Sequence, residues 1–341
     1  MSWSKFTLDN YKQFKKNMYK LSPDNKLLKS IRQERFNIIT FINNNTFLHK
    51  ITKLDNELSI KVDKFARGQF VERDRILSTL KDIPEEYLIE WGLNKIYIKT
   101  TQQQYEQFIK RISIVIGMLE YIKNNSNQQN RIFNIYLILT PLEKPSPIPD
   151  DYIRVKNVNT GYTDFMNNVI FIWRYEEFDK VLFHEALHFV DLDCREHDYH
   201  HVDNLKIDDG SGSGMEERLY EAYTDFFAIY YHLIYLSIIT KVKIKKLLEL
   251  ELTFICNQAQ QVNAYFKLNN WENIPNKVLK QDTSAFSYYI LKYMIFEYML
   301  NNNINIIKDY KIILNDIFKK GFTSKEHINT THLRMTILQL L

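Results

Sequence analysis

The first 92 residues combine polar side chains with apolar residues that recur every three or four positions. Residues 26–43 show this spacing clearly, with Ile31, Phe36 and Ile39 among the repeating apolar positions. Such a period is typical of an amphipathic helix that turns one face toward a core. The region therefore predicts helices over residues 9–20, 26–43 and 63–81.

Beyond this region the chain alternates strand-like and helix-like patterns. Residues 94–99 alternate polar and apolar side chains, which predicts a half-buried strand, and residues 102–124 carry an apolar stripe at helical spacing. Residues 131–140 are rich in strand-forming side chains and predict a central strand. After a proline-rich loop, short strands are expected over residues 152–157 and 168–173. We expect the 168–173 strand to be the sheet edge, where an extended peptide could add as a further strand.

The last third of the chain predicts helices almost throughout. The uncharged stretch of residues 226–240 is too short to span a membrane and predicts a buried helix. Further helices are predicted over residues 245–266, 283–301, 304–320 and 332–341. Before them, residues 191–214 read as a loop. It contains His197, His200, His201, Asp191, Asp193 and Asp203, so it is either an ordinary polar loop or a second metal site.

The most informative segment, residues 181–191, is apolar on nearly every side. His184 and His188 are four residues apart, so a helix places both imidazoles on one face. Two neutral imidazoles on a shared face can bind zinc together, and Glu185 can act on a water bound to that zinc. The alternative is a core helix whose histidines make ordinary hydrogen bonds. Because burial of unpartnered polar groups is costly, a metal ion gives the better account.

A catalytic zinc ion takes three protein ligands and keeps one position for water. Glu221 is our candidate for the third ligand, because it begins a helix that becomes apolar immediately afterwards. Asp225 lies one turn further on the same face and can orient a ligand histidine through its other ring nitrogen. Glu217, one turn before Glu221, is an alternative ligand, but it would leave Glu221 in the place of this orienting aspartate.

These motifs resemble those of the gluzincins, the zinc metallopeptidases typified by thermolysin. That family combines H-E-x-x-H with a downstream helix carrying E-x-x-x-D, and the run from Glu221 to Asp225 is similar to the second motif. The resemblance implies His184, His188 and Glu221 as zinc ligands and Glu185 as the catalytic base. It also implies that the Asp225 carboxylate orients one of the ligand histidines.

Asp191, three residues after the second histidine, is similar to the aspartate in neprilysin-like and anthrax-lethal-factor-like gluzincins. A metzincin pattern would need glycine at this position and histidine where Cys194 stands. A deformylase-like pattern would need a cysteine upstream of the motif, whereas Cys194 and Cys256 both follow it. The gluzincin resemblance therefore accounts for the motifs best.

The resemblance also implies an oxyanion-stabilising histidine or tyrosine from the C-terminal part of the chain. Tyr288 and Tyr289 are the first candidates and His232 the next. No motif distinguishes them from core aromatic residues, so this role stays open.

Composition narrows the range of partners and compartments. The chain has 45 Lys and Arg against 41 Asp and Glu, and no basic run interleaved with aromatic residues, so we expect no nucleic-acid partner. Two cysteines provide no disulfide framework, and the N-terminus has no signal-peptide pattern. We therefore expect a cytoplasmic protein without a membrane span, in the host cell or virion if the protein is viral.

Together the patterns predict an α+β fold with a zincin-like catalytic domain, in which a small mixed sheet supports the metal-binding helix. Pro84 and Gly92 mark the end of a helical N-terminal region, residues 1–92, of unknown role. Residues 93–241 would form the zincin subdomain, and residues 242–341 a helical C-terminal subdomain.

The expected activity is zinc-dependent hydrolysis of peptide bonds in a peptide or protein substrate, with one zinc ion per chain. One alternative is a zinc hydrolase that cleaves a non-peptide amide or only short peptides. Another is a viral or toxin-like interaction protein in which zinc is structural. Residues 1–92, which carry no catalytic pattern, are available in either case as a binding region for a protein partner.

Overall fold

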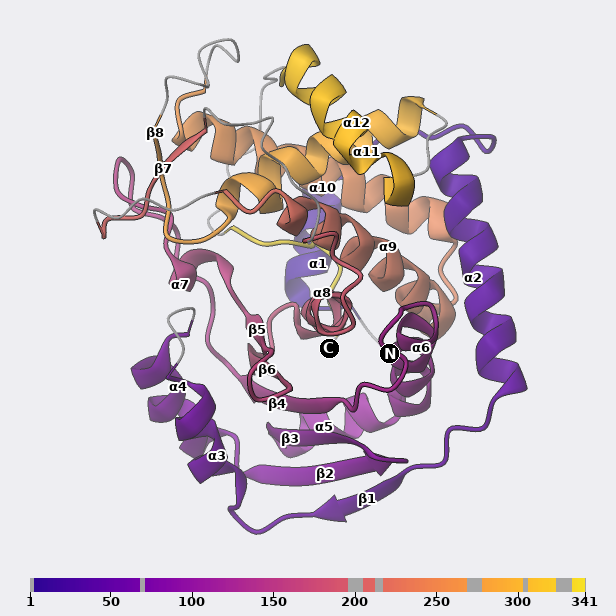
Figure 1. Ribbon diagram of the computed structural model, residues 1–341, viewed down its shortest axis with the longest axis vertical. Helices are drawn as coiled ribbons and strands as arrows, with labels where there is room; N and C mark the ends of the chain where they lie inside the picture. Colours follow the sequence, from indigo (N-terminus) through magenta and orange to yellow (C-terminus); the bar gives the residue numbers. More distant parts are fainter. Residues whose placement is uncertain are drawn as a thin grey trace.

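The computed structural model of the chain describes residues 3–67, 71–195, 205–211, 217–268, 278–302, 306–322 and 333–340. These residues form a mixed α+β fold, with a β-sheet on one side of the molecule and a layer of helices on the other (Figure 1). The α+β class expected from the sequence is confirmed.

The main sheet has six strands in the order β1-β2-β3-β4-β6-β5. Strands β3, β4 and β6 are parallel to one another, whereas β1, β2 and β5 run antiparallel to their neighbours. The central strand β4 is buried along almost its whole length, as its apolar sequence requires. The strands are β1 (Lys50–Lys53), β2 (Glu85–Trp91), β3 (Asn94–Thr100), β4 (Asn134–Thr140), β5 (Gly161–Asp164) and β6 (Val169–Arg174).

The expected edge strand is wrong. Strand β6, which covers the predicted 168–173 segment, lies inside the sheet between β4 and β5. Its six residues are all buried, whereas three of the four residues of β5 are half-buried. The hairpin therefore folds so that its first strand, β5, takes the edge position beside the helices.

Helices make up most of the remaining described residues, and Figure 1 shows α9, α10, α11 and α12 together above the sheet. A short π-helix, Phe286–Leu291, leads directly into α11. Strands β7 (Lys206–Asp208) and β8 (Val278–Lys280) form a separate parallel pair. The helices are α1 (Lys5–Phe14), α2 (Lys26–Asn44), α3 (Leu58–Phe65), α4 (Arg73–Thr79), α5 (Gln102–Ile109), α6 (Ile112–Asn124), α7 (Val155–Val158), α8 (Phe178–Phe189), α9 (Tyr220–Thr240), α10 (Ile244–Tyr265), α11 (Lys292–Asn301) and α12 (Ile306–Lys320).

In the N-terminal region, α1 and α2 lie near the helices expected over residues 9–20 and 26–43. The helix expected over residues 63–81 is instead two separate helices, α3 and α4, and the region also contains two strands that the helical pattern does not predict. Strand β1 pairs with β2, and β2 pairs with β3 along seven residue pairs, so segments on both sides of Gly92 share one sheet. Gly92 lies in the tight turn between β2 and β3 with a φ of 56°, a backbone conformation that glycine adopts without strain. The region up to residue 92 is therefore largely helical, as expected, but β1 and β2 join it to the main sheet.

Two further local predictions are wrong because distant contacts replace the local pattern. Residues 152–157 do not form a strand: Ile153 makes a single bridge to Gln281, and helix α7 begins at Val155. The predicted helix at residues 332–341 is absent over the described residues 333–340, which are mostly buried and non-helical. There Leu340 bridges to Trp3, which brings the two chain ends side by side (Figure 1).

Helices α8 and α9, which carry the two sequence motifs, occupy the centre of the molecule. Helix α8 contacts β5 and β6 on one side and α9 on the other (Figure 1). All residues of α8 are buried, and so are nearly all residues of α9. Both helices are apolar around most of their circumference, which is why they pack between layers instead of on the surface.

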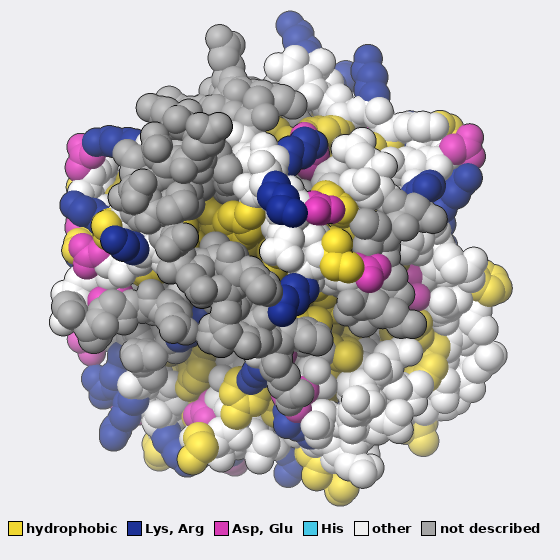
Figure 2. All heavy atoms as spheres, turned by 45° about the horizontal axis from the view of Figure 1, so that its top comes forward, with side chains coloured by type: hydrophobic (Ala, Val, Ile, Leu, Met, Phe, Trp, Pro, Cys, Tyr) yellow, Lys and Arg dark blue, Asp and Glu magenta, His cyan; other side chains and the backbone are white. Residues whose placement is uncertain are grey.

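Charged side chains are dispersed over the face in Figure 2, where basic and acidic groups alternate with apolar ones. Within the described residues, no helix combines the length and hydropathy needed to cross a bilayer.

The edge strand β5 approaches α8 closely at Gly161. A Cβ atom at this position would lie 2.8 Å from Val181 Cγ1, 3.1 Å from Ile172 Cγ1 and 3.2 Å from the carbonyl oxygen of Phe171. Only a residue without a side chain fits here, so Gly161 sets the distance between the sheet edge and the motif helix.

We predict that Gly161→Ala lowers the free energy of unfolding by about 1–3 kcal/mol, because the new methyl group overpacks the contact with α8. Val181→Ala removes the nearest atom, so the double variant should be more stable than the sum of the two single losses indicates, by at least about 0.5 kcal/mol. Urea denaturation of the four proteins measures this coupling. Simple additivity would contradict the close contact.

Candidate metal centre

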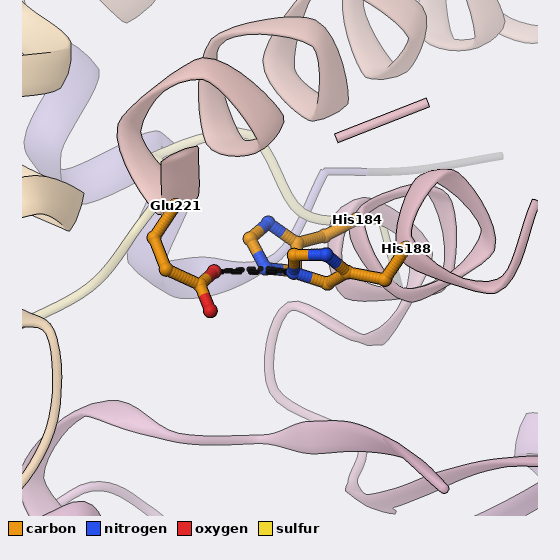
Figure 3. Close-up of side chains that lie close together, drawn as sticks. All are labelled: His184, His188 and Glu221. Atoms are coloured by element: carbon orange, nitrogen blue, oxygen red, sulfur yellow. Dashed lines mark hydrogen bonds and ion pairs between the residues drawn. The ribbon is translucent and has the colours of Figure 1, made fainter. Parts of the chain in front are cut away.

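His184 and His188 lie one turn apart on α8 and point toward the same place (Figure 3). Their Nε2 atoms are 3.0 Å apart, and both side chains are buried. The helical period that the sequence predicted therefore brings the two imidazoles together.

Glu221 reaches the same place from the first turn of α9 (Figure 3). Its Oε2 lies 3.1 Å from His188 Nε2 and 3.2 Å from His184 Nε2. Across the part of the chain that the structure describes, these three side chains form the only group of histidine, cysteine and acidic residues able to hold a metal ion. All three are the ligands predicted from the sequence.

Each histidine has a carboxylate at its outer ring nitrogen. His184 Nδ1 lies 3.0 Å from Asp225 Oδ1, as predicted for Asp225, and His188 Nδ1 lies 2.6 Å from Asp193 Oδ2. The sequence analysis placed Asp193 only in a polar loop and missed this contact. No helical spacing indicates it, because the chain leaves α8 before reaching Asp193.

Asp193 is itself held by Arg195, whose Nε donates to Asp193 Oδ2 at 2.7 Å. Arg195 also donates to the carbonyl oxygen of His188 at 2.9 Å, so it connects the loop back to the helix end. Asp191, which carries part of the family resemblance, pairs with Arg131 at 2.7 Å instead of contacting a histidine. The structure thus assigns the contact with His188 to Asp193.

Glu185 faces the same site from the side of the helix. The Thr163 hydroxyl, on the edge strand β5, donates to Glu185 Oε2 at 2.8 Å and to the Glu185 backbone carbonyl at 3.1 Å. Glu185 is buried, and this burial raises the pKa of its carboxyl group to about 7. Thr163 is a further site residue that the sequence analysis did not identify.

The two imidazoles have opposite pKa shifts. Burial lowers the pKa of His184 to about 3. Burial opposes protonation of His188 too, but the Glu221 and Asp193 carboxylates outweigh it and raise the pKa of His188 to about 10. The cluster of three acceptors thus attracts one positive charge, which in the absence of a metal ion is a proton.

A pocket of about 340 Å³ opens onto these residues. His184, Glu185, His188 and Glu221 all line it. The remaining wall combines residues of the β5 edge with arginine, aromatic and hydroxyl side chains, namely Asn159, Gly161, Tyr162, Thr163, Phe165, Arg195, Arg218, Tyr220, Thr283, Ser284 and Tyr288. A ligand in the pocket would therefore contact the three predicted metal ligands, Glu185 and the edge strand together.

Of the three aromatic candidates, only Tyr288 is brought to this pocket. Its hydroxyl donates to Glu221 Oε2 at 3.1 Å, and it comes from the π-helix before α11. Such local π-helical turns occur frequently at functional sites. Tyr289, the next residue, is buried against Lys292, and His232 is stacked on Tyr235 in the core.

The alternative ligand Glu217 points away from the histidines. It accepts hydrogen bonds from the backbone NH of Ser287, at 3.1 Å, and from the side chain of Gln281. Half of the histidine- and aspartate-rich loop, including His197, His200, His201 and Asp203, lies outside the described residues.

No protein-family model, curated protein or solved structure matches the chain.

Asp225 lies at the centre of a buried charge cluster behind His184. Its Oδ2 accepts a hydrogen bond from Lys292 at 2.6 Å, and its Oδ1 pairs with Lys180. Burial lowers the pKa of Lys292 to about 8, and burial together with Lys292 lowers the pKa of Lys180 well below its ordinary value. Burial therefore disfavours the charged form of both lysines, and nearby carboxylates, Glu177 among them, act in the opposite direction.

Glu251 on α10 belongs to the outer part of this cluster. Its Oε2 accepts a hydrogen bond from the Thr336 hydroxyl at 2.8 Å. Burial raises the pKa of Glu251 to about 7, although Thr336 and the charge of Lys292 act in the other direction, and Glu177 adds repulsion. Because the folded state favours the protonated acid, Glu251 contributes stability below its ordinary pKa of 4.5 that is lost as pH rises through 7.

Glu251→Gln mimics the protonated acid at every pH. We predict that this variant is more stable than the wild-type protein at pH ~8, by up to about 3 kcal/mol, and that the difference disappears at pH ~5. Urea denaturation of the metal-free proteins at both pH values measures it. The same substitution at the exposed Glu106 is the control and should change neither value. A Glu251→Gln variant that is no more stable than the wild-type protein at pH ~8 would contradict the assignment.

Proposed function

We propose that this protein is a zinc-dependent metallopeptidase of the gluzincin type, with a zincin-like catalytic core. One observation carries the proposal: His184, His188 and Glu221 direct one donor atom each to a single point, and the Glu185 carboxylate lines the same pocket. Helix α8, packed against the mixed sheet, and helix α9, packed on α8, would supply the ligands and the base from rigid elements.

The hydrogen bonds around the cluster fit a metal ion. His188 Nδ1 is hydrogen-bonded to Asp193, and His184 Nδ1 lies 3.0 Å from Asp225 Oδ1, so a carboxylate stands at each outer ring nitrogen. The two Nε2 atoms face each other across 3.0 Å, where their lone pairs could bind a metal ion. The Glu221 carboxylate adds a third acceptor. Three acceptors that converge in a buried place require a cation between them. Two imidazole nitrogens and one carboxylate oxygen form a donor set that catalytic zinc accepts, with one position left for water.

Bound zinc would lower the pKa of a coordinated water toward neutrality and polarise a carbonyl group of the substrate. Glu185 would accept a proton from the attacking water and then donate it to the leaving amine. Thr163 would hold the Glu185 carboxylate in one orientation, because it donates to both the side chain and the backbone of that residue. The Tyr288 hydroxyl is the donor best placed to stabilise charge that develops on the substrate oxygen.

The substrate would be a peptide or protein segment that enters along the edge strand. Residues of β5 line the pocket beside Glu185, which supports access for an extended chain. The position of Glu185 also favours catalysis over a structural zinc site, since the three ligands do not need this carboxylate.

We predict that Glu221→Gln weakens zinc binding by more than roughly 10- to 100-fold, which is the typical cost of losing a group that hydrogen-bonds to a metal ligand. Glu217→Gln is the matched control: it makes the same change one turn earlier, at a residue bonded to Gln281 and Ser287. It should leave zinc binding unchanged. Elemental analysis and competition with a chelator measure stoichiometry and affinity. A wild-type protein that takes up no zinc at neutral pH would refute the proposed centre.

We predict that Glu185→Gln keeps zinc at one ion per chain but lowers peptide hydrolysis by about 10²- to 10⁴-fold, because the amide cannot accept the proton. Cleavage of a diverse peptide mixture, followed by mass spectrometry, measures the activity. Equal activity of the variant and the wild-type protein would exclude Glu185 as the base. If the zinc-loaded wild-type protein cleaves no peptide in the mixture while it retains the ion, a structural zinc site becomes the better account.

A further inference from the structure

The two carboxylate oxygens of Asp225 have three nitrogen partners, which belong to Lys180, Lys292 and His184. Its Oδ2 accepts from Lys292 alone, whereas its Oδ1 faces both Lys180 Nζ and His184 Nδ1. Asp225, Lys180 and Lys292 are at most 1% exposed, so water does not relieve the competition. Lys180 therefore contacts the carboxylate oxygen that faces His184, whereas Lys292 contacts the other oxygen.

The competition is visible at His184. Its Nδ1 lies 3.0 Å from Asp225 Oδ1, yet this buried nitrogen makes no aligned hydrogen bond. Lys180 Nζ bonds to the same oxygen. Asp225 is thus near His184 but is oriented partly toward Lys180.

Lys292, in contrast, is anchored from outside the site. It donates to the Met335 carbonyl oxygen at 3.2 Å in addition to Asp225 Oδ2. The second contact of Lys180 is the Met335 sulfur at 3.2 Å, which is a weak acceptor. Through Lys292, the buried C-terminal segment fixes the far oxygen of Asp225 and leaves the near oxygen directed at His184.

We propose that Lys292 and Lys180 are positioning residues that set the affinity of the metal centre in opposite directions. Lys292 strengthens metal binding because it holds Asp225 against His184, and Lys180 weakens it because it takes up the same carboxylate oxygen. This inference rests on the proposed metal centre.

The physical basis is the effect of an outer carboxylate on a ligand imidazole. A carboxylate that accepts the Nδ1 proton orients the ring and raises the basicity of Nε2, and losing such a partner typically costs 10- to 100-fold in affinity. A cation on the accepting oxygen reduces that oxygen's negative charge and weakens the effect. Lys180 does this directly, whereas Lys292 acts on the other oxygen.

Simple repulsion between cations makes a different prediction. Both lysines place positive charge near the site, so removal of either one would tighten metal binding if repulsion alone mattered. The proposed mechanism instead gives opposite signs for the two variants, which separates the two explanations in one measurement.

The test compares Lys180→Met and Lys292→Met, which keep chain length and remove the ammonium group. Zinc dissociation constants are measured at neutral pH by competition with a chromophoric chelator. We expect about tenfold tighter binding for Lys180→Met and about tenfold weaker binding for Lys292→Met. Lys99→Met is the control, because Lys99 is also buried but pairs with Glu86 in the sheet; the zinc affinity of this variant should match the wild-type value. Shifts of the same sign for the two test variants, or no shift, would overturn the proposal.

A double variant tests whether Lys180 acts through Asp225. In the Asp225→Asn background, Lys180→Met should no longer change zinc affinity, because the carboxylate for which the two groups compete is gone. An undiminished effect of Lys180→Met in that background would also overturn the proposal. Circular dichroism verifies the fold of each variant, and Lys180→Gln replaces Lys180→Met if the latter does not fold. Failure of the proposed metal centre is distinguishable, since it would appear as loss of zinc binding in the wild-type protein itself.

Discussion

Three hydrogen-bond acceptors meet at one buried point between α8 and α9, and much of the surrounding structure serves to hold them there. Two imidazole nitrogens and a carboxylate oxygen lie within 3.0–3.2 Å of one another. Such an arrangement is unfavourable unless a cation occupies it. The crossing of the two apolar helices fixes the distances, and the sheet below them keeps α8 from moving away.

The charges around this point alternate in sign with distance from the site. Asp193 and Asp225 stand behind the histidines, and Arg195, Lys180 and Lys292 stand behind the aspartates. Each buried charge thus has an opposite charge next to it, as buried ions require. The final contacts are made by the C-terminal segment, whose Met335 carbonyl holds Lys292. A segment far from the motifs in sequence therefore contributes to the order of the site.

The pocket joins this centre to the edge of the sheet. Glu185 points toward β5, where the Thr163 hydroxyl donates a hydrogen bond to its carboxylate, and Gly161 allows the strand to lie directly on the helix. An extended substrate, the proposed base and the proposed metal would meet on this side of α8. The packing that buries the helix thus still leaves His184, Glu185 and His188 lining the pocket.

Much of the candidate site could be predicted from the sequence because it depends on helical periodicity. The four-residue spacing of His184 and His188, and of Glu221 and Asp225, is a local property that any helix converts into a shared face. Glu221 was chosen as the third ligand from its place at the start of an apolar helix, and the family resemblance supported that choice; the structure brings it to the two histidines.

The remaining features depend on contacts between segments that are distant in sequence, and local patterns carry no signal for them. Strand β5, not β6, forms the sheet edge because pairing order is decided by how the hairpin folds onto β4. Asp193 reaches His188 through a loop, and Thr163, Lys292 and Met335 reach the site from three separate elements. The sequence alone determined which residues share a helix face. Only the tertiary structure decided which other elements pack against that face, since long-range packing and ion pairing have no fixed spacing along the chain.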